Sequence, residues 1–360
     1  MKTIILTKPY LLYETANLLY AHINGIDPSE MTTREPQALR PDQITSLLHQ
    51  CCDGLDREQP ELQYYFKERA LEGCDGPYCL AFAMVYSFML WENPDWQAHL
   101  ASLEQYWLRL QQTGYQIHSV GTMGLRMEQN PDKQGVPLST QIYQLGIPAE
   151  ERLELIEVFT NYGRHLQILG QLMAPVAEKL EPALADYAPT VQRCGDDWQA
   201  YFRECCPVEE YLRQRGRLEL SPGVHQVAVG FSLTNGWLLG GDTRDDTFFL
   251  FIGIGHACST QVGSRGPGLM NDGEIFAIKQ MGDKNRLAIL RMLWDNESYC
   301  LELSQRLGMN PGTVSRTLTN MYNTGLLDAR QAGGRTYYRT DRVRVEALFR
   351  NLLQYFRQED

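Results

Sequence analysis

Apolar residues recur at helical spacing through most of the chain from Pro9 to Gln214. In the segment Pro9–Ile23, for example, Leu12, Ala16 and Leu19 fall at i, i+4 and i+7, on one face of an amphipathic helix. The same spacing predicts further helices that begin at Pro41 or cover Glu61–Ala70, Pro77–Trp91, Asp95–Thr113, Pro148–Leu172 and Asp196–Gln214. Met173–Leu184 is expected to continue the helix that ends at Leu172, beyond a kink at Pro175.

The pattern changes to alternation after residue 222. The segment HQVAVGFSLTNGWLLGG alternates and contains Asn235-Gly236, a dipeptide typical of hairpin turns. Asp245–Gly255 contains an apolar run with the length of a buried strand, and Thr3–Thr7 is a further expected strand. The predicted fold class is therefore α+β and mostly helical, with a small antiparallel sheet over residues 223–255, joined by Thr3–Thr7, in a large N-terminal helical domain.

Two short helices separated by a turn are predicted between Leu301 and Tyr322. Gly308 is typical of the residue that follows a helix C-terminus. Asn310 is a good N-cap for the second helix, and Pro311 suits its first position, where a missing N–H costs nothing. The buried face of the second helix is expected to contain Val314, Leu318 and Met321.

The opposite face of the second helix is small and polar. Such a surface fits the major groove of DNA, where Arg, Asn, Ser and Thr side chains reach base edges and phosphates. It contains Thr313, Ser315, Arg316, Thr317, Thr319 and Asn320. A hairpin with strands at 329–331 and 335–339 follows, and its basic residues predict phosphate contacts. A last helix from Arg342 to about Phe356 has a broad apolar stripe, which indicates a helix partner.

In this order, IFAIKQMGDKNRLAILRML, LSQRLGMNPGTVSRTLTNMYNTGLL and ARQAGGRTYYR resemble the ArsR-type winged-helix transcriptional regulators over residues 272–360. The resemblance implies a C-terminal winged helix-turn-helix that binds double-stranded DNA as a homodimer, paired through its first and last helices. Thr313, Ser315 and Arg316 then face the major groove, and the hairpin is a wing held on phosphates. The predicted DNA-binding residues are Asn310, Thr313, Ser315, Arg316, Thr317, Asn320, Arg330, Arg335 and Tyr337.

The metal sites of this family are not expected here. The thiol site requires a Cys-x-Cys pair, and the matching positions hold Tyr299, Cys300 and Leu301. The site on the last helix requires His ligands, and no His follows His256. We therefore expect no metal and no cofactor, and Cys300 is expected to be a small hydrophobic residue in the helix-turn-helix core.

Charge distinguishes the two ends of the chain. Residues 272–360 contain 13 Lys and Arg against 11 Asp and Glu, a net charge of +2; the whole chain has −11, so residues 1–271 have −13. This balance supports nucleic-acid binding by the C-terminal region alone. At 360 residues we expect an effector or dimerisation domain over 1–262, a Gly/Pro-rich linker over 263–273 and a DNA-binding domain over 274–360.

Other groups of polar residues have simpler explanations than a site. Asp242, Asp245 and Asp246 fit a polar turn between strands better than a cation site. No Gly-x-Ser-x-Gly motif occurs, and we expect no catalytic residue and no enzyme activity. A redox or arsenical sensor is less favoured than buried structural thiols for the neighbouring cysteines, which are Cys51-Cys52, Cys205-Cys206, and Cys74 with Cys79.

The predicted function is a cytoplasmic, dimeric, sequence-specific transcription regulator, expected to be a repressor at a palindromic operator. A small-molecule or protein effector is expected to act on its N-terminal domain. The apolar run Leu80–Trp91 is too short to span a membrane. Two alternatives remain, namely an enzyme with an appended winged helix and a protein-interaction scaffold. Clustered catalytic groups in one pocket would favour the first, and a covered second helix would favour the second.

Overall fold

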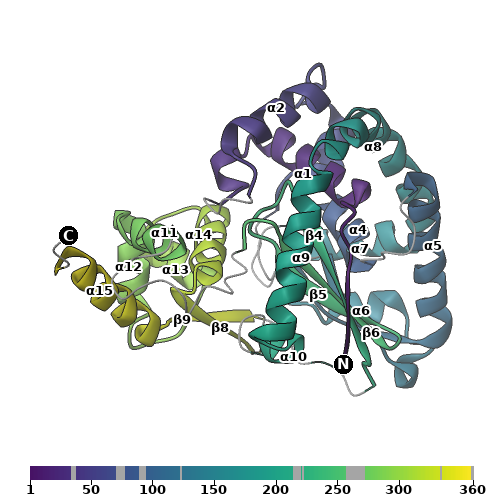
Figure 1. The fold of residues 1–360 in the computed structure, drawn as a ribbon. Coiled ribbons are helices and arrows are strands. Elements are labelled where there is room, and N and C mark those ends of the chain that lie inside the picture. Colours follow the sequence, from purple (N-terminus) through teal and green to yellow (C-terminus); the bar gives the residue numbers. More distant parts are fainter. Residues whose placement is uncertain are drawn as a thin grey trace. The chain divides into compact units, whose positions relative to one another are not determined.

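The computed structural model describes residues 1–33, 38–69, 78–88, 95–121, 124–213, 220, 223–256, 272–332 and 335–357 (Figure 1). The chain divides into two compact units. The first contains Met1–Arg69 and Tyr78–Thr260, and the second contains Gln261–Asp360. The predicted linker over 263–273 lies outside the described residues, except for Asp272 and Gly273, which begin a helix. Within the described part, no helix combines the length and the apolar character needed to cross a bilayer.

A four-stranded mixed sheet forms the centre of the first unit. Its strand order is β1 (Lys2–Ile5), β4 (Gln226–Ser232), β6 (Thr247–Gly253) and β5 (Leu239–Arg244). β1 pairs parallel to β4, and β4 pairs parallel to β6, whereas only β5 and β6 are antiparallel. The strands were therefore predicted correctly, but the purely antiparallel sheet is wrong. β4 lies between two parallel neighbours, which explains why it is almost wholly buried.

The hairpin turn predicted at Asn235-Gly236 is also wrong. β4 and β5, which flank this dipeptide, both pair with β6 and not with each other. The Gly236 N–H donates instead to the Met31 carbonyl at 2.8 Å, so the loop packs against a distant segment of the chain. The hairpin of this sheet joins β5 to β6, and Asp245 forms its turn with a φ of +53°. A polar turn at Asp245-Asp246 is confirmed.

Helices form most of the first unit, and most of them lie where the hydrophobic pattern predicts. The helix predicted over Glu61–Ala70 ends at Phe66, and the one predicted over Asp196–Gln214 is wrong in its bounds, because the helix covers Ala188–Glu204. Ala70, Pro77, Trp91 and Gln214 themselves lie outside the described residues. Short 3-10 helices cover Pro28–Glu30, Tyr86–Phe88 and Pro131–Lys133. The α-helices are α1 (Leu11–Asn24), α2 (Pro41–Cys52), α3 (Pro60–Phe66), α4 (Leu80–Val85), α5 (Trp96–Thr113), α6 (Leu138–Tyr143), α7 (Ala149–Thr160), α8 (Tyr162–Ala185), α9 (Ala188–Glu204) and α10 (Val208–Tyr211).

Helices cover both faces of the four-stranded sheet. Phe231 and Phe251 point to opposite faces, because they are one position out of register in neighbouring parallel strands. On the Phe231 face, α9 approaches so closely that a Cβ on Gly195 would lie 2.9 Å from the Ile5 side chain. On the other face, Tyr13 of α1 packs edge-on against Phe251 with ring centroids 5.5 Å apart. The first unit therefore has a helix–sheet–helix layering (Figure 1).

The boundary between α7 and α8 differs from the prediction. The sequence pattern favours one helix over Pro148–Leu172, but the chain breaks at Asn161, which has a non-helical ψ of 34°. α8 then continues through Pro175 and Pro182 as one helix. Apolar spacing alone does not detect this break, because both helices bury the same kind of residue at the same period.

A second, two-stranded sheet in the first unit was not predicted. β2 (Tyr115–Gly121) and β3 (Gly124–Gln129) form an antiparallel pair with a register shift between Ile117 and Ser119. The strands follow Gly114, whose φ of +91° ends α5. At a register shift of this kind, the regular alternation of apolar and polar residues along a strand is interrupted, so the sequence pattern did not indicate a strand here.

The second unit is a winged helix-turn-helix. Its three strands are ordered β7-β9-β8, and its helices enclose a single cluster of buried apolar side chains. The two helices predicted between Leu301 and Tyr322, the hairpin and the last helix are all present, whereas β7 was not predicted. The elements are α11 (Asp272–Met281), α12 (Lys284–Met292), β7 (Ser298–Tyr299), α13 (Cys300–Leu307), α14 (Pro311–Asn323), β8 (Leu327–Ala332), β9 (Arg335–Thr340) and α15 (Arg342–Arg357).

Candidate nucleic-acid interface

The turn between α13 and α14 is fixed by local sequence. Gly308 adopts the left-handed conformation with a φ of +65°, and the Met309 N–H donates to the Ser304 carbonyl at 3.0 Å. The Asn310 side chain then accepts a 2.8 Å hydrogen bond from the Gly312 N–H, and Pro311 is the first helical residue. Glycine closure of one helix and Asn capping of the next are both as predicted, and together they set the direction in which α14 leaves the turn.

One face of α14 anchors it in the core of the second unit. Val314, Leu318 and Met321 are fully buried, as the i, i+4, i+7 spacing predicts. They pack in the same cluster as Ile289 of α12 and Leu303 of α13. This packing holds the polar face of α14 on a rigid support.

The polar face of α14 is open for most of the predicted residues. Asn310 and Thr313 are exposed, and Arg316, Thr317 and Asn320 are partly exposed. The Thr317 hydroxyl donates to the Thr313 carbonyl at 2.9 Å, so it is oriented along the helix. No Asp or Glu occurs in α14, and an anion approaching this face therefore meets no carboxylate from the helix itself.

Ser315 does not belong to the open face. Only 5% of this residue is exposed, and its hydroxyl forms a hydrogen bond with the Cys300 sulfur. α13 packs along the side of α14, so the buried arc of α14 is wider than its three apolar positions suggest. The prediction that Ser315 faces the major groove is therefore wrong in this structure.

Cys300 lies in the contact between the two helices, as predicted for a small core residue. Its Sγ donates to the Pro311 carbonyl at 3.3 Å, and it packs against the core of the second unit. Burial raises the pKa of Cys300 to about 11, which keeps it a neutral thiol at physiological pH.

The wing consists of β8 and β9, with β7 added to the edge of β9. Arg330 pairs with Tyr337 in the β8–β9 ladder, and Ala332 pairs with Arg335. Tyr338 packs against the core, so the alternating residues Arg335 and Tyr337 point to the outer face of the sheet. The predicted turn at Gly333-Gly334 and the Arg330 side chain lie outside what the structure describes.

Two further residues of this surface were not predicted. Arg339 is exposed and shares the outer face of β9 with Arg335 and Tyr337. Tyr299 of β7 pairs with Tyr337, and its ring lies against Arg335. Strict alternation along β9 could have indicated Arg339, whereas a two-residue strand such as β7 leaves no sequence pattern.

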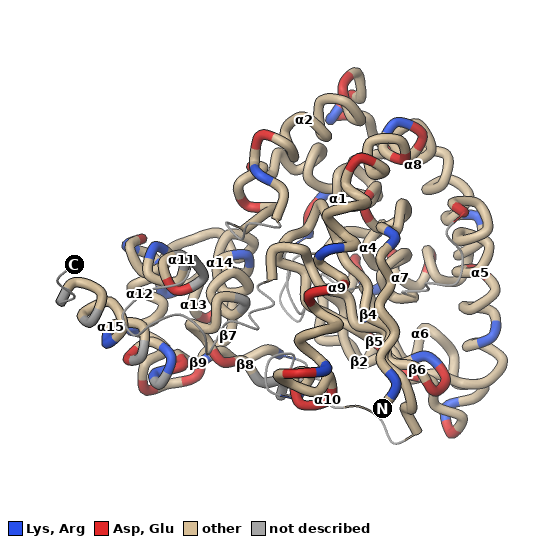
Figure 2. Tube along the Cα trace, in the orientation of Figure 1, with Lys and Arg blue, Asp and Glu red and all other residues tan. Residues whose placement is uncertain are grey.

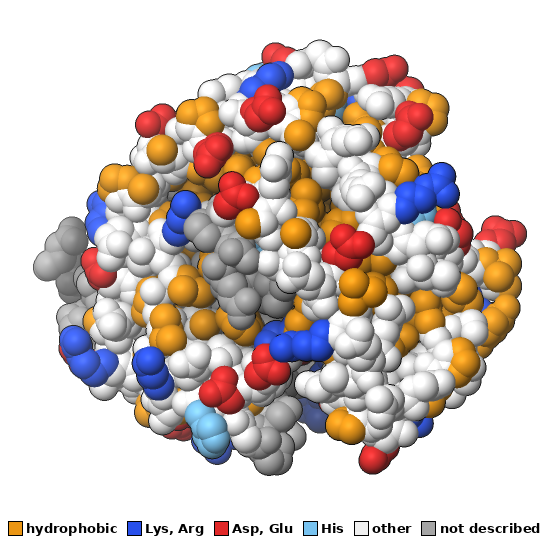
Figure 3. Space-filling view, turned by 90° about the vertical axis from the view of Figure 1, so that its right-hand side faces the viewer, with side chains coloured by type: hydrophobic (Ala, Val, Ile, Leu, Met, Phe, Trp, Pro, Cys, Tyr) orange, Lys and Arg blue, Asp and Glu red, His pale blue; other side chains and the backbone are white. Residues whose placement is uncertain are grey.

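Charged residues of both signs are interspersed along the second unit (Figure 2). On the wing, Asp328 lies directly opposite Arg339 in the β8–β9 ladder, so the basic residues of this sheet have an acidic neighbour. The face in Figure 3, seen from the side on which α5 lies in Figure 1, also mixes acidic and basic side chains among neutral and hydrophobic ones. The net charge of residues 272–360 is only +2 and charges of both signs are mixed, so any attraction of this unit for DNA would depend on where individual Arg side chains lie.

Metal ligands do not cluster in the described part of the chain, where no group of three or more His, Cys, Asp or Glu residues is placed to hold an ion. At the positions matching the family's thiol site, the Tyr299 side chain packs on the wing and Cys300 bonds a carbonyl. Neither arrangement provides a thiolate pair.

The cysteines of the first unit are mostly structural. Cys51, Cys52, Cys79 and Cys194 are buried, and Cys205 is exposed. Burial raises the pKa of Cys52, Cys79 and Cys194 to about 12, so these thiols are poor nucleophiles. Cys74, predicted as a neighbour of Cys79, lies outside the described residues.

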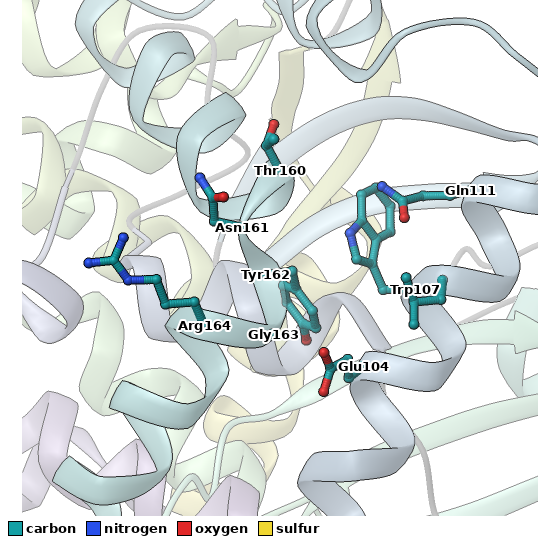
Figure 4. Close-up of a pocket in the computed structure, with 9 residues that line it drawn as sticks. Glu104, Trp107, Gln111, Thr160, Asn161, Tyr162, Gly163 and Arg164 are labelled. Carbon is teal, nitrogen blue, oxygen red and sulfur yellow. The ribbon is translucent and has the colours of Figure 1, made fainter.

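A surface groove of about 320 Å³ lies at the junction of α7 and α8 (Figure 4). Figure 4 shows the side chains of Glu104 and Tyr162 converging at the start of α8, whereas Arg164 points away. The Glu104 carboxylate lies so close to Gly163 that any Cβ there would collide with it. A carboxylate at a helix N-terminus stabilises the helix, so Glu104 has a structural role in this groove.

The second unit is similar to known proteins. A family model described as "Bacterial regulatory protein, arsR family" matches residues 283–329. The transcriptional activator HlyU of Vibrio cholerae serotype O1 (strain ATCC 39315 / El Tor Inaba N16961) is 32% identical over 74 residues, which cover 21% of this chain and 68% of that protein. This chain belongs to the ArsR family. The resemblance inferred from the C-terminal motifs is thereby confirmed.

Two solved structures are also similar to parts of this ArsR-family chain. HlyU from Vibrio cholerae N16961 is 29% identical, with 25% of this chain and 100% of that chain covered and a TM-score of 0.21. The homodimeric winged helix-turn-helix DNA-binding domain of Mb0332 (fragment 1-100) from Mycobacterium bovis, described as a possible ArsR-family transcriptional regulator, is 30% identical. The similar region covers 24% of this chain and 83% of the Mb0332 chain, with a TM-score of 0.20.

Proposed function

We propose that this chain is a sequence-specific transcription regulator that binds double-stranded DNA as a homodimer through α14 and the β8–β9 wing. The observation that carries the proposal is the polar face of α14. It is free of carboxylates, contains Arg316, and is held on a rigid core by three fully buried apolar residues. Membership of the ArsR family supports the same role.

In the proposed complex, α14 enters the major groove. Arg316 and Asn320 have the hydrogen-bonding groups that discriminate guanine and adenine there, and Thr313 can contact either a base edge or a phosphate. Asn310 and Thr317 border this contact. Arg335, Tyr337 and Arg330 hold the wing on the phosphate backbone, which fixes the register of the helix without reading sequence.

The proposed dimer uses the exposed apolar side of α15. Phe349, Leu353 and Phe356 follow each other at i, i+4 and i+7 and are 49%, 54% and 72% exposed. Large apolar side chains gathered on one helix face indicate a protein interface. Two copies joined in this way would each present an α14, and a palindromic operator requires these helices to be about 34–36 Å apart.

The first unit is proposed to control DNA binding and not to catalyse a reaction. A small molecule or protein that binds this unit better in one dimer geometry would shift the population toward that geometry and change the affinity for DNA. We propose repression as the direction and the cytoplasm as the location. HlyU is named as an activator. A reporter assay that measures transcription with and without this protein distinguishes the two directions, and activation would contradict the proposed repression.

The proposal is tested by selecting sheared genomic DNA of the source organism on the full-length protein and sequencing the bound fragments. We expect a small set of enriched upstream regions. Arg316→Ala should lower the affinity for the enriched fragment by about five- to 150-fold, because a good bidentate base contact contributes about 1–3 kcal/mol. Arg164→Ala, a change in the first unit, is the control and should leave affinity unchanged. If no region were enriched, the proposal that this protein binds DNA sequence-specifically would be wrong.

A further inference from the structure

Tyr299 is an unfavourable residue at its position in the backbone. It is the N-cap of α13 and has no side-chain hydrogen bond to the helix. Ser, Thr, Asn or Asp at this position would satisfy one of the free N–H groups at the start of the helix, and Tyr cannot. A residue that breaks a local rule in this way is expected to have a role elsewhere.

The Tyr299 ring lies on the outer face of the wing. It is opposite Tyr337 in the β7–β9 ladder, and the two rings meet edge-on with centroids 5.6 Å apart. The guanidinium carbon of Arg335 lies 4.6 Å from the centroid of the Tyr299 ring, which is the geometry of a cation–π contact. Arg335 is diagonal to Tyr299 across the ladder, within the reach of a long side chain.

We infer that Tyr299 is a positioning residue for phosphate binding, which deepens the proposed function and rests on it. The Tyr299 ring holds the planar Arg335 guanidinium on the outer face of the wing before DNA arrives. A free Arg side chain loses its rotamer freedom on binding, and a prearranged one loses less. Because β7 runs directly into α13, the same ring also connects the position of the wing to the helix-turn-helix.

A double-mutant cycle on full-length protein tests this inference, with a random-sequence duplex as the probe. Tyr299→Leu should weaken binding about two- to fivefold, and Tyr299→Phe, which keeps the ring, should bind like the wild type. In an Arg335→Ala background, Tyr299→Leu should have no further effect, because the group that it positions is gone. Equal losses from Tyr299→Leu with and without Arg335 would overturn the inference, and so would a loss in Tyr299→Phe equal to that in Tyr299→Leu.

A second measurement does not depend on DNA. In the free protein, the ring current of Tyr299 should shift the Arg335 Nε–Hε NMR resonance, and this shift should persist in Tyr299→Phe and vanish in Tyr299→Leu. Thermal unfolding of each variant establishes that the fold is retained. If the wild-type protein bound no duplex but the shift were present, the proposed function would be wrong, whereas the contact between Tyr299 and Arg335 would be confirmed. If the shift were absent from the wild type, the positioning role would fail on its own.

Discussion

The buried carboxylate of Glu14 joins α1 to the end of β4 in the first unit. Glu14 of α1 has no exposed surface, and it accepts hydrogen bonds from the Leu233 and Thr234 N–H groups, each at 2.8 Å, just beyond β4. The Thr234 hydroxyl donates to it as well. The hydrophobic pattern predicted the helix but not this contact, because the partners are more than 200 residues apart.

Replacing Glu14 by Gln should destabilise the first unit by roughly 1–3 kcal/mol, since the amide would leave a buried N–H or hydroxyl without an acceptor. Urea unfolding measures the change in the free energy of unfolding. Glu181→Gln, at an exposed position of α8, is the matched control and should change it by less than about 0.5 kcal/mol. Equal effects of the two substitutions would show that the buried contact contributes little.

Comparison of the wild type with Glu14→Gln also predicts how the free energy of unfolding depends on pH. Burial raises the pKa of Glu14 above its ordinary value of 4.5, more than the hydrogen bonds from Thr234, Leu233 and Ser232 lower it. The native state therefore holds the proton more tightly than the unfolded chain. The contribution of Glu14 to stability is complete below about pH 4.5 and is lost as pH rises through the raised pKa. The stability of wild type relative to Glu14→Gln should fall across that window, and a rise would contradict this assignment.

At the scale of elements, α14 was predictable because its limits are set by neighbouring residues. Gly308, Asn310 and Pro311 determine where one helix ends and the next begins, and each acts within a few residues. The strand order β1-β4-β6-β5 depends instead on pairing between distant segments, and the burial of Ser315 depends on how α13 packs against α14. The period of apolar residues predicts whether a segment is a helix or a strand, but it does not predict which other elements that segment packs against.

The cap of α14 can be tested directly. Asn310→Ala removes the acceptor of the Gly312 N–H and should destabilise the second unit by about 1 kcal/mol. Asn310→Asp keeps a capping oxygen and is the matched control. Hydrogen exchange at the Gly312 amide should become several-fold faster in the Ala variant only. Unchanged exchange in Asn310→Ala would indicate that the turn is held by packing and not by the cap.

At the scale of the whole molecule, the chain combines an acidic N-terminal region with a winged helix that is close to neutral. Residues 1–271 have a net charge of −13 and would repel DNA in bulk, so the proposed binding would be confined to the second unit. The exposed apolar face of α15 also concerns the whole molecule. An apolar surface of this kind is typical of an interface with another protein chain.

Leu353→Glu should convert the proposed homodimer to a monomer, since a carboxylate would be buried in an apolar interface. Analytical ultracentrifugation at micromolar concentration measures the change. Leu153→Glu is a matched control, because Leu153 of α7 is similarly exposed at 57%, against 54% for Leu353. Dissociation by the α7 substitution, with the α15 variant still dimeric, would place the interface in the first unit.

Binding of DNA by the polar helix and basic wing of the second unit should depend on salt, because phosphate contacts release counterions. The most direct test is the affinity of the full-length protein for the enriched duplex as a function of salt concentration, measured by fluorescence anisotropy. A dimer that neutralises roughly six phosphates should give a linear fall of log K with log [salt], with a slope of about −5. No binding at low salt, or an affinity that does not change with salt, would contradict the account.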